Sequence, residues 1–371
     1  MASSTVGQDF GVLETERYIP LIVLGSISSL LSIFGSTCVI YMSSKKLHKI
    51  MHRLVFLLSI SDIMASLAAL FMPYMVPSFM GLLGAVGNVA SCSAAGFFLS
   101  LGVMMACCYN FYLSGYYLAT VRKNWKEYDF RKPFEIAGHA LALLVPLAIS
   151  LIAATTGSMN PSPLANNLCS YTTWPWECFH NDDIPCERSS PELVTAVTIS
   201  RATFTMVLTT ISFIFTFTVW WTVRATLKKS DSYRFAGSSD NSSRTDERLK
   251  EVSTQAILYS LVYLNTFFWP FFGLVAGFGL SHEEMQDKKT KAGFYIVQVL
   301  YWMLYPLQGF FNFFVYTRLK FKAWRKADPD RSLVSIYHQI MIAKEAPPLS
   351  QRRQVRPETK QTNTSSNSAA H

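Results

Sequence analysis

Charged residues are scarce in this chain. Asp, Glu, Lys and Arg make up 15% of its 371 residues, whereas hydrophobic residues make up 50%. A soluble domain usually carries about 25% charged residues, so the composition argues against one. The first 17 residues, up to Arg17, also lack an apolar run before any cleavage site, and a cleaved secretory signal is therefore not expected.

Long apolar stretches fill most of the sequence that follows. A helix that spans a bilayer needs about 20 mostly apolar residues. Seven windows meet this requirement: 18–42, 53–80, 91–119, 133–157, 192–224, 252–280 and 292–317. The sequence therefore predicts an all-α membrane protein built as a bundle of seven transmembrane helices.

The basic residues predict how this bundle is oriented. With the amino terminus placed outside, the inner segments hold 27 of the 33 Lys and Arg residues, and the outer segments hold five. Because Lys and Arg concentrate in cytoplasmic segments, the amino terminus is expected outside and the carboxyl terminus in the cytoplasm. The net charge of +9 is then expected to face anionic membrane lipids and not nucleic acid.

The polar segments complete the predicted organisation. Residues 318–326 read RLKFKAWRK and alternate bulky apolar with basic residues, which is typical of a helix lying on a membrane surface. The tail beyond it and the connection 225–251 are too polar to pack and are predicted to be disordered. The expected parts are an extracellular tail (1–17), the seven-helix domain (18–317), an amphipathic juxtamembrane helix (318–327) and a disordered cytoplasmic tail (328–371).

Seven cysteines divide into two groups. Three lie inside apolar windows and are expected to be small buried residues: Cys38, Cys107 and Cys108. Four lie on the predicted outer side, where oxidising surroundings favour disulfides: Cys92, Cys169, Cys178 and Cys186. Their separations do not match paired zinc ligands, so no metal site is expected. Four cysteines allow three pairings, and we expect Cys92 to join one of the three loop cysteines and to pin that loop over the bundle.

Several short motifs occur in order along the windows. The second window, RLVFLLSISDIMASLAALFMP, holds Asp62 in a Leu-x-x-x-Asp pattern, and Cys92 begins the third. The sixth contains the pair Trp269-Pro270. The seventh contains Gln308-Gly309-Phe310 followed by Asn312 and Tyr316. Over roughly 18–326 the chain resembles G-protein-coupled receptors, and its seventh window looks like the cyclic-AMP-receptor-like and secretin-like branches.

This resemblance implies a function. A member of the superfamily would sit in the plasma membrane, bind an extracellular ligand and activate a heterotrimeric G protein, without enzymatic activity or a cofactor. The chain departs from the rhodopsin-like branch in having no Asp-Arg-Tyr, where Gly115-Tyr116-Tyr117 stands instead, and no Asn-Pro-x-x-Tyr. An arginine-based inner latch is therefore not expected, and Tyr117 and Tyr316 become candidate switch residues.

Two charged residues lie inside apolar windows. A charge at the bilayer centre costs at least ~2.5–3.5 kcal/mol, so it normally faces the bundle interior. Asp62 is expected to be either a polar switch with Asn312 or Gln308 as its partner, or simply a satisfied interhelical hydrogen bond. Arg201 is expected to bind an anionic ligand group, or else to snorkel outward or pair with Glu192.

Prolines and aromatic residues supply the remaining candidates. Pro270 and Pro306 each remove a helix hydrogen bond and are expected to act as hinges, although prolines are also simply tolerated in membrane helices. Trp269 is a candidate pocket floor, and Tyr295 a second candidate ligand contact, while ordinary core packing explains an aromatic residue equally well.

Other functions are less well supported by the sequence. A retinal protein needs a buried lysine, and the seventh window has only Lys291 at its outer edge. An intramembrane hydrolase needs clustered His, Asp or Cys, whereas Asp62 and His139 stand apart. The alternative that stays open is a membrane transporter or channel with a seven-helix bundle, although no internal repeat is apparent.

Overall fold

The computed structural model describes residues 15–123, 125, 134–162, 168–179, 181, 183–234, 241–279 and 288–342. The long helices are α1 (Thr15–Ser44), α2 (Ile50–Met75), α3 (Val89–Arg122), α5 (Phe134–Thr155), α6 (Pro191–Arg234), α7 (Asn241–Gly279), α8 (Lys288–Leu304) and α9 (Gln308–Ala327). The shorter elements are η1 (Ser78–Met80), β1 (Met159–Ser162), β2 (Leu168–Tyr171), η3 (Trp176–Phe179), η5 (Tyr305–Leu307) and α10 (Leu333–Ile342). The chain divides into two compact units, Met1–Val315 and Tyr316–His371.

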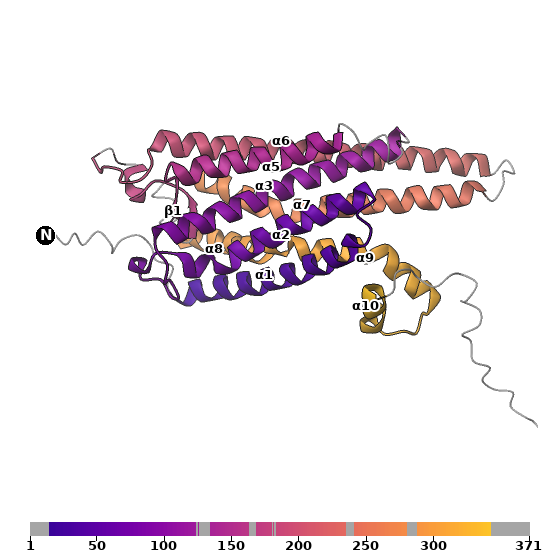
Figure 1. Ribbon diagram of the computed structural model, residues 1–371, viewed down its shortest axis with the longest axis horizontal. Helices are drawn as coiled ribbons and strands as arrows, with labels where there is room; N and C mark the ends of the chain where they lie inside the picture. Colours follow the sequence, from indigo (N-terminus) through magenta and orange to yellow (C-terminus); the bar gives the residue numbers. More distant parts are fainter. Residues whose placement is uncertain are drawn as a thin grey trace, which may run out of the picture. The chain divides into compact units, whose positions relative to one another are not determined.

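The first unit is a bundle whose long helices run side by side (Figure 1). Five of the described helices, α1, α2, α3, α5 and α6, are long and apolar enough to cross a membrane. They coincide with the first five predicted windows. The sixth window overlaps α7 up to Gly279, and the seventh corresponds to α8, η5 and the first part of α9. Helical structure is therefore confirmed at all seven windows, and the first five of these helices are candidate membrane spans.

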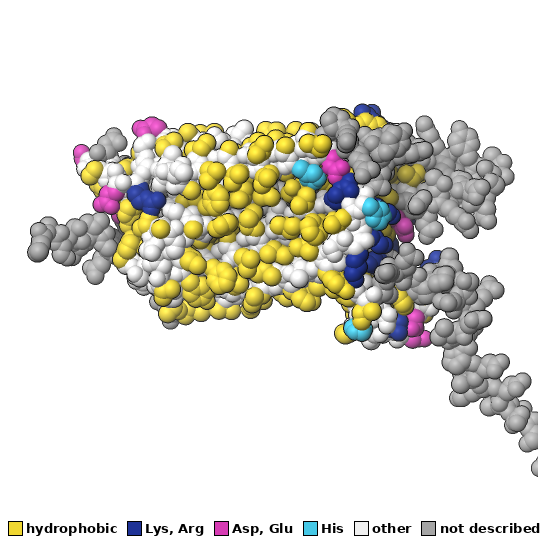
Figure 2. All heavy atoms as spheres, in the orientation of Figure 1, with side chains coloured by type: hydrophobic (Ala, Val, Ile, Leu, Met, Phe, Trp, Pro, Cys, Tyr) yellow, Lys and Arg dark blue, Asp and Glu magenta, His cyan; other side chains and the backbone are white. Residues whose placement is uncertain are grey.

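Helix α3 lies at the centre of the bundle, because it packs against α2, α5, α6 and α7. Small polar residues fill the interior of α1, including Ser28, Ser29, Ser32 and Ser36, which are all buried. Large apolar side chains instead cover the outside, as Figure 2 shows over the middle of the bundle. Phe34 and Phe217, for example, are about 60% exposed. This inversion is expected of helices whose outer faces contact lipid.

Two glycines bring α1 and α9 into backbone contact. A Cβ on Gly35 would lie 2.7 Å from the Cα of Phe310, and a Cβ on Gly309 would lie 2.0 Å from the Ser36 Oγ. The backbone N–H of Gly309 donates a hydrogen bond of 3.1 Å to the Ser32 Oγ. Donors in the first turn of a helix have no partner within that helix, so Ser32 of α1 supplies one for α9.

A lid covers one end of the bundle, and we call this the lid end. The lid is the connection between α5 and α6, and its strands β1 and β2 pair antiparallel, with Pro161 opposite Cys169. A disulfide joins Cys92 at the start of α3 to Cys169 in β2, and a second joins Cys178 to Cys186. The expectation that Cys92 pins the loop over the bundle is confirmed. The lid end is the end that the sequence predicts to be extracellular.

The connection between α6 and α7 differs from the sequence-based expectation. Residues 225–251 were predicted to be disordered, but α6 continues to Arg234 and α7 begins at Asn241. At the end away from the lid, both helices extend past their neighbours (Figure 1). Extending an existing helix by one residue adds a hydrogen bond without the cost of nucleation, which explains why a polar sequence continues the helices.

The described part of the second unit consists of the end of α9 and the helix α10. The second part of α9 reaches Ala327, so the predicted juxtamembrane helix over 318–327 continues α9 without forming a separate element. Within the tail predicted to be disordered, α10 is helical, and the rings of Phe321 and Tyr337 stack 5.4 Å apart. Ile336 and Ile340, one turn apart, are fully buried. Their i, i+4 spacing explains the helix, because it gives α10 an apolar stripe.

Candidate functional site beneath the lid

The start of α3 fixes where the lid attaches. Asn88 and Ser91 form a reciprocal capping box, in which the Ser91 N–H donates to Asn88 and the Asn88 N–H donates to the Ser91 Oγ. Cys92 follows directly and carries the disulfide to the lid. Arg188 adds a second attachment, since its Nη2 donates to the Ser93 Oγ at 3.2 Å. Partial burial lowers the pKa of the Arg188 guanidinium from its ordinary value.

The side chain of Tyr171 in the lid contacts two helices of the bundle. Its hydroxyl shares a hydrogen bond with the Oγ of Ser100 on α3. Its ring lies under the guanidinium of Arg201 on α6, with 5.0 Å between the Arg201 Cζ and the ring centroid. The lid thus connects α3 and α6 through one side chain.

Arg201 is a half-buried cation that pairs with none of the described acidic residues. Among the residues that the structure describes, no carboxylate lies within 4.0 Å of its guanidinium. Glu192, considered above as a partner, instead hydrogen-bonds with Ser190. The guanidinium interacts electrostatically with the phenols of Tyr301 and Tyr305, whose rings stack 5.1 Å apart. One tyrosine ring thus lies against Arg201 and two further phenols interact with it electrostatically, whereas no described carboxylate pairs with it.

A polar cluster lies deeper in the bundle, around Asp62. The Nδ2 of Asn312 donates a 2.9 Å hydrogen bond to the Asp62 Oδ2, which brings the second and seventh predicted windows together. Ser66 donates to the Ser32 Oγ at 2.9 Å. A cavity of about 20 Å³ adjoins these groups. This is room for about one water molecule, which needs 10–15 Å³.

Gln308 and η5 form the wall of this cavity. The Gln308 Oε1 accepts a long hydrogen bond of 3.5 Å from Thr266, and its buried Nε2 has no partner within the described residues. The 3-10 turn η5 holds Pro306 and separates α8 from α9, so the predicted interruption at this proline is observed. A 3-10 segment within a long helix often marks a hinge. Tyr305 begins η5, lines the cavity and interacts electrostatically with Arg201, so it links the two groups.

Sequence reasoning missed a third group, which joins α3, α6 and α7. The hydroxyl of the buried Tyr263 shares hydrogen bonds with the Thr209 Oγ1 at 2.6 Å and with the Cys107 Sγ at 2.8 Å. Thr216 and Ser260 form another such contact between α6 and α7, at 2.5 Å. The sequence indicates this group only through the polar residues that recur within the apolar windows. The expectation that Cys107 is a small buried residue does not include a hydrogen bond.

The end away from the lid is closed by interhelical contacts. Arg53 on α2 donates from Nε and Nη2 to both carboxylate oxygens of Glu135 on α5, at 2.5 and 3.0 Å. The Nε2 of Gln255 on α7 donates to the Val315 carbonyl at 3.4 Å. Tyr117 is buried in α3, and its hydroxyl has no hydrogen-bond partner among the described residues.

The other predicted residues make different described contacts or have side chains outside the described part of the chain. Tyr295 is half-buried and packs against the core at the lid end, which includes Trp302. Trp269 is half-buried, and its ring meets that of Phe268 edge to face. The backbone at Pro270 belongs to α7, but its side chain lies outside the described part of the chain. Tyr316 is buried in α9.

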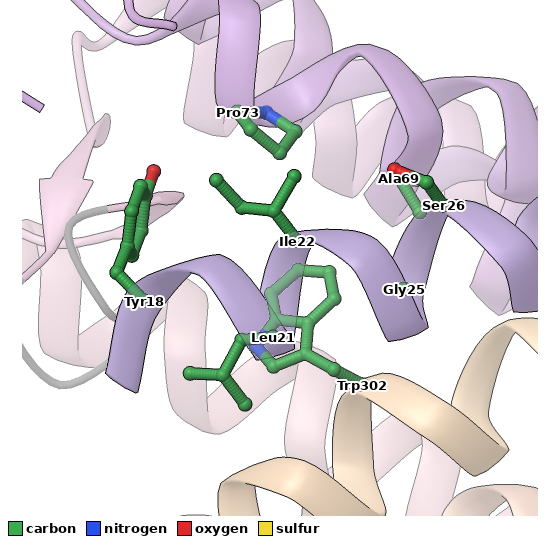
Figure 3. Close-up of a pocket in the computed structure, with 8 residues that line it drawn as sticks. All are labelled: Tyr18, Leu21, Ile22, Gly25, Ser26, Ala69, Pro73 and Trp302. Carbon is green, nitrogen blue, oxygen red and sulfur yellow. The ribbon is translucent and has the colours of Figure 1, made fainter. Parts of the chain in front are cut away.

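A second cavity lies between α1, α2 and α8, and Figure 3 shows its lining. It measures about 10 Å³, and apolar side chains such as Ile22 and Trp302 surround it. The buried hydroxyl of Tyr18 has no hydrogen-bond partner among the described residues. Ligand sites usually enclose about 300–1,000 Å³, so this cavity is a packing gap.

Comparison with known proteins identifies the fold. No protein-family model matches the chain, and no curated protein matches it either. Solved structures do match: the crystal structure of squid rhodopsin aligns with a TM-score of 0.62 at 15% identity, covering 94% of this chain and 97% of the squid chain. The chain therefore has a rhodopsin-like fold, and its function has to be argued from its sites.

Proposed function

We propose that this protein is a G-protein-coupled receptor of the plasma membrane, with the lid outside the cell and the carboxyl terminus in the cytoplasm. It binds an extracellular ligand that carries an acidic group and activates a heterotrimeric G protein. The rhodopsin-like fold over nearly the whole chain supports this reading. The Gln308-Gly309-Phe310 pattern supports a place near the cyclic-AMP-receptor-like or secretin-like branch.

Arg201 is the observation that carries the proposal. It lies ten residues into α6, about 15 Å from the start of the helix at 1.5 Å per residue. A guanidinium at this depth is costly unless it has a partner, and none of the described carboxylates supplies one. Its planar fork of N–H donors matches the geometry of a carboxylate or phosphate. A ligand that enters beneath the lid would supply the missing anion.

The mechanism uses the three groups in turn. A ligand that binds Arg201 better in one arrangement of the helices shifts the population towards that arrangement. Tyr305 lines the Asp62 cavity and interacts electrostatically with Arg201, so η5 is placed to respond. Release of the Tyr263 hydrogen bonds would then let α7 move away from α3 and α6. The G protein docks in the cleft opened between the inner ends of α6 and α7, and anionic lipids attract the basic inner connections.

A coupling experiment tests the proposal. The full chain, with an epitope tag at each terminus, would be expressed in cells and screened for ligand-dependent energy transfer to a set of G proteins. We expect coupling with the amino-terminal tag outside and the carboxyl-terminal tag inside. Two tags on the same side of the membrane would refute the topology. Correct topology without coupling to any G protein, with or without ligand, would count against the receptor.

A substitution tests the role of Arg201 within that assay. Arg201→Ala should weaken the response to an acidic ligand by roughly tenfold or more, because a charge-assisted hydrogen bond contributes about 1.5–3 kcal/mol. The response to a neutral ligand of the same receptor should change little. Equal losses for both ligands would show that Arg201 acts on the fold and not on the ligand.

A transporter is the second candidate, and one observation favours it. The break at η5 lines a small polar cavity, and interrupted helices of this kind bind substrates in many transporters. Uptake of radiolabelled organic anions into proteoliposomes would distinguish the two functions. Saturable uptake that Asp62→Asn abolishes would support transport, and its absence in a preparation that couples to G protein would exclude it.

A further inference from the structure

A lid side chain lies deep inside the bundle. Cys169 is held at Cys92 by the disulfide, with their Cα atoms 5.3 Å apart. Tyr171 is two residues further on, yet it reaches Ser100, which is eight residues beyond Cys92 along α3. Eight helical residues correspond to about 12 Å. The Tyr171 side chain therefore points down from the lid towards the bundle interior.

Both ends of this side chain are held. The Arg201 Cζ lies over the Tyr171 ring, 5.0 Å from its centroid, and the Tyr171 hydroxyl bonds to Ser100, which also accepts a 3.3 Å hydrogen bond from Ser150 on α5. The phenols of Tyr301 and Tyr305 interact electrostatically with the same guanidinium. A place next to the Arg201 guanidinium is thus already occupied by a part of the chain itself.

We propose that Tyr171 is a tethered plug that occupies the ligand's place, and that the ligand is an aromatic anion which displaces it. This inference rests on the proposed function for the existence of a ligand, and it adds how the site is kept closed and which chemical class opens it. The disulfide keeps the plug attached when it leaves, so the site closes again once the ligand dissociates.

The contacts that Tyr171 makes define the class of ligand. An occupant that replaces it has to offer the guanidinium the face of an aromatic ring. It has to bond to Ser100, which requires an oxygen or nitrogen on that ring. It also has to outcompete a tethered group. The negative charge that Tyr171 lacks provides this advantage at an arginine with no acidic partner among the described residues. A planar ring that carries an anionic group and a hydrogen-bonding substituent meets all three conditions.

Competition by the plug has a measurable consequence. A ligand binds only the fraction of molecules in which the plug has left, so its apparent affinity is lowered by that fraction. The same fraction limits the rate at which a reagent reaches Arg201. Removing the ring should therefore expose Arg201 to reagents and strengthen the binding of small aromatic anions.

The experiment labels arginines in the purified full-length chain with p-hydroxyphenylglyoxal and follows Arg201 by peptide mass spectrometry. Arg224 serves as an internal reference, because it also lies over an aromatic ring, that of Trp220, but belongs to the part of α6 remote from the lid. Tyr171→Ala should raise the labelling rate of Arg201 relative to Arg224 roughly fivefold, the factor that corresponds to one cation–π contact. Tyr171→Phe keeps the ring and should raise it much less.

A lid variant controls for general loosening. The double variant Cys178→Ala/Cys186→Ala removes the second disulfide but leaves Tyr171 in place. Its labelling of Arg201 should stay near that of the wild type. The plug would be overturned if this variant raised the labelling rate of Arg201 as much as Tyr171→Ala does, or if Tyr171→Ala did not raise that rate at all. The labelling experiment needs neither ligand nor G protein, so a protein that fails to couple can still be tested for the plug. If the protein couples to G protein but Tyr171→Ala leaves the labelling of Arg201 unchanged, only the plug is refuted.

Protection from labelling tests the ligand class. The probes are 4-hydroxybenzoate, which is aromatic and anionic, and acetate, which has the same charge without a ring. In Tyr171→Ala, 4-hydroxybenzoate should protect Arg201 at concentrations at least roughly fivefold lower than in the wild type. Acetate should protect less well than 4-hydroxybenzoate in this variant. Equal protection by the two anions would refute the aromatic part of the proposal.

Discussion

Replacing Gly35 with alanine tests whether α1 and α9 touch through their backbones. The added Cβ would lie 2.7 Å from the Phe310 Cα and 2.8 Å from the Gly309 carbonyl oxygen. An ordinary contact begins at 3.4 Å, so the helices have to separate by about 0.6–0.7 Å. Both obstructing atoms belong to the backbone, and no side chain can rotate away to make room.

The size of the effect follows from two opposing terms. Overpacking of this kind usually costs about 1–3 kcal/mol. Replacing a glycine within a helix by alanine returns about 0.5–1 kcal/mol through the unfolded state. We expect Gly35→Ala to lower the free energy of unfolding by about 0–2.5 kcal/mol net. At an unfolding entropy of about 0.8 kcal/mol/K for 371 residues, this corresponds to a fall of up to about 3 °C in the unfolding midpoint.

A matched control lies on the same helix. A Cβ on Gly25 would meet its nearest neighbour, the Cε3 of Trp302, at 3.4 Å, which is an ordinary contact. Gly25→Ala should therefore leave the midpoint unchanged or raise it slightly. The two variants share the same chemical change and the same helix, so the difference between their midpoints isolates the contact with α9.

The free cysteines provide the assay. Cys38, Cys107 and Cys108 are buried, and a thiol-reactive fluorogenic dye reports their exposure on heating. Cys38 lies one turn from Gly35, so it would be replaced by alanine in every variant to leave the signal to α3. A midpoint for Gly35→Ala equal to or above that of Gly25→Ala would refute the close backbone contact.

Three further predictions concern the interhelical contacts. Asn312→Leu should lower the free energy of unfolding by about 1–3 kcal/mol, because it leaves the Asp62 carboxyl without its donor. The exchange Asp62→Asn/Asn312→Asp restores an amide–carboxyl pair and should recover most of that midpoint, and no recovery would contradict the pairing. Tyr263→Phe removes both hydrogen bonds of its hydroxyl and should raise ligand-independent coupling to G protein; unaltered coupling at matched surface expression would show that these bonds do not hold the inactive state. Arg53→Ala and Glu135→Ala should each lower the midpoint, and the double variant should lose less than the sum by about 1 kcal/mol, whereas strict additivity would mean that the ion pair adds nothing.

Hydropathy made the positions of the helices predictable, because the cost of a polar group in lipid leaves a strong pattern in the sequence. The same cost explains why Asp62 could be assigned to the bundle interior and why Asn312 was a correct candidate partner. The break at Pro306 also followed from local chemistry, since proline removes a hydrogen bond wherever it occurs in a helix.

Contacts between distant segments were not predictable in this way. The pairing of Cys92 with Cys169 depends on how the β1–β2 hairpin folds back over α3, and three pairings were compatible with the sequence. The contact of Tyr171 with Arg201 joins a loop strand to a helix thirty residues further on, and neither residue type reveals the other. The helical continuation to Arg234 was missed because composition reports whether a segment can pack and not whether a neighbouring helix extends into it.

The length of α6 makes it a lever with unequal arms. Thr209, bonded to Tyr263, lies eight residues from Arg201 and 25 residues from Arg234, where the helix ends. At 1.5 Å per residue the arms measure about 12 Å and about 38 Å. If α6 tilts by about 10° around Thr209, a displacement of about 2 Å at Arg201 becomes about 6–7 Å at the Arg234 end. In the proposed receptor, a ligand would therefore have to move the Arg201 end of this helix by little more than the length of a covalent bond to displace the other end by the width of a side chain.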